Sequence, residues 1–179
     1  SNIAQAHKIA ADGVAAEATT IAAGPGSFSF QVGSGAVQTV SVDATTTLAD
    51  LKNSINGLNA GVTATIVNDG TGANPYRLVL TSNSTGASNA VTITQNDTSL
   101  LFSTTIQSAQ DASFKVDGFT YTRSSNTVSD VISGVTLVLK SADPAKTLNI
   151  SVSRNTADIE KKINTFVEKY NSVIKHIKA

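Results

Sequence analysis

The stretch NTVSDVISGVTLVLKSAD, residues 126–143, carries the strongest local pattern in the chain, and its first half reads as a helix. Thr127 is followed three residues later by Asp130, a spacing typical of a helix start, because the hydroxyl can accept a hydrogen bond from a free backbone N–H and the acid lies at the positive end of the helix dipole. The apolar residues that would then share one helical face are Val128, Val131 and Ile132. The spacing therefore predicts a helix of about one turn.

The second half of this stretch predicts a β-strand. Gly134 would end the helix, because glycine adopts left-handed backbone without strain. Beyond it, three apolar residues recur at every second position, which is strand periodicity: Val135, Leu137 and Leu139. We expect a short capped helix joined to a strand, with strained or left-handed backbone at Gly134.

Residues 45–68 repeat this order of features. Thr47 and Asp50 have the same helix-start spacing, and Gly61 precedes a second alternating segment. Helix-face residues are Leu48, Leu51 and Ile55, Gly57 ends the helix, and the alternating strand residues are Val62, Ala64 and Ile66. Phe28 likewise parallels the region around Phe114. Two explanations stay open, an internal duplication and the independent use of the same turn chemistry.

Further alternating segments predict a largely β architecture. Strands are expected at 27–32, 37–43, 76–83, 89–96 and 146–155, and the first two should form a hairpin. Residues 97–111 are polar and are expected to be a connection, and the N-terminal residues 1–27 are rich in alanine and threonine.

The last segment predicts a long amphipathic helix from residue 156 onward, with Asn155 as its N-cap. Apolar residues recur alternately four and three positions apart, and two more widen the row: Ile159, Ile163, Phe166, Tyr170, Val173 and Ile177, with Val167 and Ile174. Such a heptad seam must be buried against another helix. The sequence predicts no second helix of comparable length, so we expect the partner in another subunit or in further chain, as in an internal piece of a longer protein.

Composition excludes several classes of function. The 13 basic and 13 acidic residues give zero formal net charge, and no basic stripe suggests nucleic acid or an anionic membrane as partner. Without cysteine, neither disulfides nor thiolate chemistry is available. A reducing compartment and export without disulfides are equally compatible with this. No apolar run is long enough to predict a membrane span.

No constellation predicts catalysis, a cofactor or a metal. His7 and His176 lie far apart in the sequence, each without a second ligand nearby. The segment 68–75 resembles a calcium loop only faintly, through Asn68, Asp69 and Asn74, and turn chemistry explains it better. The sequence therefore predicts a protein that is not an enzyme.

Several segments resemble one known family. SNTVSDVISGVTL (125–137), VSRNTADIEKKINTFVEKYNSVI (152–174) and IAQAHKIA (3–10) are similar to the bacterial flagellar filament-cap proteins, hook-associated protein 2. The unit LADLKNSIN followed by AGVTATIV (48–67) resembles an insertion motif that flagellins and their relatives share.

The resemblance implies an α+β, mainly β fold with two β-rich domains and short capped helices. Residues 28–99 would be one domain, inserted into a second formed by 1–27 and 100–155, and 156–179 would begin a coiled stalk. The seam residues would form the assembly interface, with Gly61 and Gly134 as structural corners.

It also implies a secreted, extracellular homo-oligomer, often a pentamer, at the flagellum tip. This cap would retain exported flagellin and promote its folding and polymerisation, and could adhere to host mucin or glycans.

Two alternatives stay open. One is flagellin or another hook-associated axial protein. The other is a stand-alone glycan-binding adhesin, which should carry a shallow aromatic site, although the only tyrosines are Tyr76, Tyr121 and Tyr170.

Overall fold

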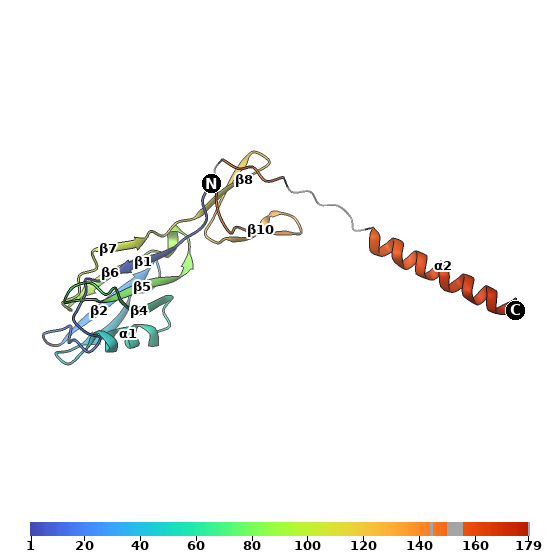
Figure 1. Ribbon diagram of the computed structural model, residues 1–179. Coiled ribbons are helices and arrows are strands. Elements are labelled where there is room, and N and C mark those ends of the chain that lie inside the picture. The colour runs from blue at the N-terminus through green and yellow to red at the C-terminus, as the bar shows by residue number, and fades with distance from the viewer. Residues whose placement is uncertain (144, 150–155, 179) are drawn as a thin grey trace. The chain divides into compact units, whose positions relative to one another are not determined.

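The structure, a computed structural model, describes residues 1–143, 145–149 and 156–178, and it has the predicted α+β, mainly β character (Figure 1). The chain divides into two compact units, Ser1–Pro144 and Ala145–Ala179, and each is described by itself. Within the described ranges, neither helix combines the length and the apolar composition needed to cross a membrane.

Two antiparallel sheets form the main body of the first unit (Figure 1). The four-stranded sheet has the order β4 (Val62–Asn68), β5 (Tyr76–Thr85), β1 (Ala6–Ala10) and β7 (Thr104–Gln107). The three-stranded sheet has the order β3 (Gln38–Val42), β2 (Gly26–Val32) and β6 (Val91–Asn96). A 3-10 turn, η1 (Ala87–Asn89), precedes β6, and α1 (Leu48–Gly57) contacts β3 and β4.

One hydrophobic core lies between these sheets and α1. Phe28 and Phe30 on β2 are fully buried, and the centroids of the Phe28 and Phe102 rings lie 5.5 Å apart. Other fully or almost fully buried side chains are Ile21, Leu48, Leu51, Ile55, Leu78, Leu80 and Leu100. Each such side chain contributes about 1.5–3 kcal/mol by leaving water. Because Ile21 and Leu100 share this core with Phe28, the core draws on both of the expected β-rich domains.

The helix α1 confirms the prediction for residues 45–68. The Thr47 hydroxyl accepts from the Asp50 N–H at 3.2 Å, and the Asp50 carboxylate accepts from the Thr47 N–H at 3.0 Å. This reciprocal capping box satisfies two N–H groups at the helix start. The chain then turns through Gly61, whose φ is 75°, into β4.

Four further strand predictions are confirmed by β2, β3, β5 and β6, and β2 pairs with β3 as the predicted hairpin. A further strand was predicted at 146–155. Residues 146–149 carry no strand, and residues 150–155 lie outside the described residues.

The prediction of a helix that begins at Thr127 is wrong. Residues Thr127–Ile132 form strand β10, which pairs antiparallel with β11 (Val135–Val138). The pairing shifts register, because Val128 and Ile132 are four positions apart while their partners Leu137 and Val135 are only two positions apart. This irregularity interrupts the strand alternation and produces apolar spacings that resemble a helical face.

A second hairpin lies before β10. It consists of β8 (Ala112–Val116) and β9 (Phe119–Arg123), and the rings of Phe114 and Tyr121 stack across it at 5.9 Å. The apparent repeat therefore holds for the hairpins β2–β3 and β8–β9, but a helix follows the first and a strand follows the second.

Two strands of the main sheet were not predicted. β1 contains His7 and Lys8 and lacks clear alternation, and β7 lies inside the segment 97–111 that was expected to be a connection. Strand β1 lies between β5 and β7, so its backbone is paired on both edges. Strand β7 forms because its backbone pairs with β1.

Candidate functional site

The second unit contains the predicted long helix, α2 (Ala157–Ile177). We call its apolar row the α2 stripe: Ile159, Ile163, Phe166, Val167, Tyr170, Val173, Ile174 and Ile177. Apart from the half-buried Ile174, these side chains are between 46% and 73% exposed. All the predicted interface residues thus lie on one helix and remain accessible to a partner.

Local interactions within α2 support the helix itself. Asp158 and Glu160 lie in the first turn, while Lys175 and His176 lie in the last, which complements the helix dipole. The rings of Phe166 and Tyr170 stack at 6.4 Å. These contacts leave the stripe itself uncovered, and about 1.5–3 kcal/mol is gained for each large apolar side chain that a partner buries fully.

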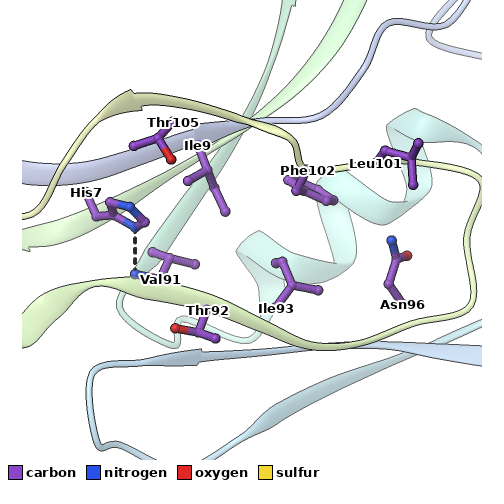
Figure 2. A pocket seen from close by; sticks show the side chains of 9 residues that line it. All are labelled: His7, Ile9, Val91, Thr92, Ile93, Asn96, Leu101, Phe102 and Thr105. Atoms are coloured by element: carbon purple, nitrogen blue, oxygen red, sulfur yellow. Dashed lines mark hydrogen bonds between the residues drawn. The ribbon is translucent and has the colours of Figure 1, made fainter.

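A shallow cavity of about 420 Å³ lies on the first unit between β1, β6 and β7 (Figure 2). Its lining is His7, Ile9, Val91, Thr92, Ile93, Asn96, Leu101, Phe102 and Thr105. The His7 Nδ1 accepts a hydrogen bond from the Val91 N–H at 2.9 Å and so joins strands of the two sheets. His7 therefore has a structural contact, and the sequence pattern gave no sign of it.

The segment considered as a calcium loop is a hydrogen-bonded turn. The Asn68 Oδ1 accepts from the Gly70 N–H at 2.9 Å, and the Asp69 carboxylate accepts from Thr71 and from the Arg77 guanidinium. The bond from Arg77 is the main cause that lowers the pKa of Asp69 to about 2. Side-chain oxygens of Asn68 and Asp69 are thus engaged by the protein itself.

No metal cluster is found in the described ranges, where no three His, Cys, Asp or Glu side chains could hold an ion together. The two histidines belong to different units, His7 on β1 and His176 on the last turn of α2. Asp130 forms an ion pair with Arg123 at 2.8 Å, which joins the two hairpins.

The two predicted glycine corners have positive φ, 75° at Gly61 and 77° at Gly134. Gly61 lies between α1 and β4, as expected, but Gly134 lies in the turn between β10 and β11 rather than at a helix end. A Cβ at Gly134 would meet no atom within 4 Å, so the reason for glycine there is the backbone conformation alone.

A junction between the main body and the two hairpins was not predicted. The Asn126 side chain binds the backbone of Ala4 through Oδ1 and Nδ2, and the Asp111 carboxylate accepts from the Ala87 N–H at 2.8 Å. The Thr85 hydroxyl donates to the Ser124 carbonyl at 2.6 Å. These partners are up to 122 positions apart in the chain, so local patterns contain no sign of them.

Two family models match the chain. The model described as flagellar hook-associated protein 2 C-terminus matches residues 109–179, which include both hairpins and α2. The model described as flagellin hook IN motif matches residues 27–84, which include α1 and its flanking strands.

Relatives and solved structures agree with these matches. The B-type flagellar hook-associated protein 2 of Pseudomonas aeruginosa is 32% identical over 178 residues, which cover 85% of this chain and 37% of that protein. The crystal structure of the flagellar cap protein FliD from Bdellovibrio bacteriovorus is 30% identical with a TM-score of 0.66, covering 81% of this chain and 85% of that one. FliD (HAP2) from Pseudomonas aeruginosa PAO1 reaches a TM-score of 0.74 at 28% identity, covering 99% and 87%.

The chain spans just over a third of the length of the Pseudomonas relative. The structural similarity extends over the two sheets of the main body, the two hairpins and α2, since one of the solved structures covers 99% of this chain. Sequence identity and fold agree along the same residues, and on this basis the chain belongs to the flagellar hook-associated protein 2 family.

Proposed function

We propose that this chain is part of a flagellar filament cap. In this proposal the protein is secreted, forms a homo-oligomer at the extracellular filament tip, and retains exported flagellin while promoting its folding and polymerisation. The solved relative from Bdellovibrio bacteriovorus, which is described as a flagellar cap protein, supports the assignment. The observation that carries it is the exposed α2 stripe, because a long apolar row on a helix is typical of an assembly surface.

The polar groups of the chain favour a role in contact rather than in chemistry. The carboxylates of Asp50, Asp69 and Asp130 each engage a neighbouring side chain or helix start, and His7 bonds to β6. The cavity beside His7 is shallow and lined mainly by aliphatic, amide and hydroxyl groups. We therefore expect the activity to depend on assembly rather than on one polar side chain.

The two alternatives differ from this proposal in testable ways. A flagellin or another axial protein would be incorporated along the filament, whereas a cap protein stays at its tip. An adhesin for mucin or glycans would use an exposed aromatic side chain, and within the first unit Phe119 on β9, 69% exposed, offers one. Adhesion would then be lost in Phe119→Ser, while motility would remain.

The test is the double change Ile163→Asp and Phe166→Asp, introduced into the protein in a motile cell. Both side chains belong to the stripe, and a buried unpaired carboxylate is heavily penalised. We expect few or short filaments, reduced motility and flagellin monomers in the medium. A count of secreted flagellin together with filament length measures the effect.

The matched control is Asn164→Asp with Asn171→Asp, which adds the same charge on the polar side of α2. This variant should make normal filaments. Single changes of His7, His176, Asp69 or Asp130 to Ala should also leave capping intact. Normal filaments from the stripe variant, or lost capping in a folded single variant, would contradict the proposal.

A further inference from the structure

The side chain of His7 covers the free edge of the three-stranded sheet. Strand β6 pairs only with β2, so its other edge has no strand partner within the described residues. The Ala90 carbonyl accepts from the Gly33 N–H at 2.8 Å, and since the C=O and N–H of one trans peptide point in opposite directions, the Val91 N–H points away from β2. It donates instead to the His7 Nδ1 at 2.9 Å (Figure 2). An imidazole nitrogen on β1 therefore takes the place of a strand carbonyl and joins the two sheets.

The backbone of β1 is irregular on both sides of this contact. Its pairing with β5 shifts register between Ala6 and Lys8, and its pairing with β7 shifts between Lys8 and Ile9. Register irregularities of this kind redirect side chains relative to a regular strand. In Figure 2 the His7 ring lies at the wall of the cavity and points to the backbone of β6, so the contact closes one end of that cavity.

The hydrogen bond requires an unprotonated Nδ1. A backbone N–H can only donate, so Nδ1 of His7 accepts through its lone pair, and the single proton of the neutral ring lies on Nε2. A second proton would occupy Nδ1 itself and set one N–H against another, which abolishes the bond. Histidine side chains ordinarily change charge between pH 5 and 8, so mild acid is sufficient to remove a contact of this kind.

The surroundings of His7 offer little compensation for a positive charge. Among the described elements beside it, β6, β7 and η1 carry no charged residue. Lys8, the next residue on β1, is itself a cation. Tyr76 and Arg77 lie at the start of β5, whereas the His7 region of β1 pairs with its end. Asp111 already accepts from a backbone N–H of η1. A protonated ring would thus gain no new carboxylate partner in place of the lost bond.

We propose that the His7–Val91 bond is an acid-sensitive contact between the two sheets. At neutral pH the ring holds β6 against β1 and covers its edge, and in mild acid protonation of Nδ1 releases the Val91 N–H and opens the cavity there. An uncovered strand edge is a template for pairing with another chain, so acid would turn a closed edge of the main body into one that can pair. This device lies in the first unit and depends neither on α2 nor on assembly.

Hydrogen exchange of the Val91 amide tests the contact directly. It is followed by NMR in the full 179-residue chain, with rates corrected for the intrinsic effect of pH on exchange. One linked proton changes an opening equilibrium by up to about tenfold per pH unit, so the protection of Val91 should fall about fivefold to tenfold between pH 7.5 and 5.5. The Leu80 amide, inside β5, should keep its protection over the same range.

Three variants locate the effect. In His7→Asn an amide oxygen can accept at the place of Nδ1 and does not titrate, so the protection of Val91 should be kept at pH 7.5 and should no longer depend on pH. His7→Phe keeps a ring without an acceptor and should leave Val91 weakly protected at both pH values. His176→Asn removes the histidine of α2 and should leave the pH dependence of the parent unchanged.

The nitrogen chemical shifts of the His7 ring in the parent chain need no variant. They should show the proton on Nε2 at pH 7.5 and on both nitrogens at pH 5.5. A proton on Nδ1 at pH 7.5 would overturn the inference even if His7→Asn failed to fold. Protection of Val91 that stays constant from pH 7.5 to 5.5, or that falls equally in His7→Asn, would also overturn it.

Discussion

The side-chain amide of Asn126 holds the backbone of Ala4 as a neighbouring strand would. Its Oδ1 accepts from the Ala4 N–H at 2.7 Å, and its Nδ2 donates to the Ala4 carbonyl at 2.9 Å. Asn56 makes the same pair of bonds to Ala64, both at 2.8 Å. One amide thus satisfies both polar groups of a residue, and the pair at Asn126 ties the N-terminal segment to β10.

Asn126→Ala should therefore destabilise the protein by about 1–3 kcal/mol, because Ala4 is only 3% exposed and its two polar groups would lose their partner. Urea unfolding measures the loss, and faster hydrogen exchange at Ala4 locates it. Asn53→Ala, at an exposed position of α1, is the control and should be nearly neutral. Unchanged exchange at Ala4 would contradict the role of Asn126.

Gly134→Val should cost about 1–2 kcal/mol, because a β-branched residue resists the φ of 77° in the β10–β11 turn. Space is not the cause, since no atom lies within 4 Å of a Cβ placed there. Gly24 is equally open and lacks positive φ, so Gly24→Val is the matched control with a smaller expected effect. Equal melting temperatures for both variants would refute the backbone explanation.

Low pH should remove the contribution of Asp69 to the stability of the fold. Its pKa in the folded protein is about 2, below the ordinary 3.8, mainly because of the bond from Arg77. A lowered pKa stabilises the fold above about pH 4, and this stabilisation is lost as the pH falls through about 2. Thermal melting should thus show Asp69→Asn less stable than the parent at pH 7, with the difference shrinking between pH 4 and 2. A difference that stays constant down to pH 2 would rule out this linkage.

Thr47 and Thr127 have the same sequence pattern but different environments. Thr47→Ala removes a capping hydroxyl and should cost about 1 kcal/mol. Thr127→Ala changes an exposed strand residue and should cost less, a few tenths of a kcal/mol. Denaturant midpoints of the two variants compare them directly, and a larger loss for Thr127→Ala would mean that the two environments have been misassigned.

This pair also shows how far the sequence predicts the fold. At Thr47 the helix pattern continues for ten residues with a buried face, and local capping agrees with packing. At Thr127 the pattern is only one turn long, and the β-branched residues pair with β11 instead. A short apolar run does not distinguish a helix from an irregular strand, because its tertiary partner decides.

The candidate sites also divide into those that local spacing predicts and those that depend on contacts between distant residues. The helix that carries the α2 stripe could be predicted because heptad spacing is a local property of one helix, while the role of the stripe as an interface stays a prediction. The His7–Val91 contact and the Asn126–Ala4 pair were not predicted, because each joins residues that are more than 80 positions apart. Strand β1 was missed for a related reason, since its burial depends on β5 and β7.

Hydrogen exchange of the α2 amides tests the central claim most directly, namely that this helix acts by contact with a partner. The measurement compares the monomeric chain, at a concentration where light scattering shows one copy, with the oligomer that we propose it forms. Because the stripe is exposed and an isolated helix is marginal in water, α2 should exchange much faster than β5 in the monomer and slow down on assembly. An α2 as protected as β5 in the monomer would contradict the account.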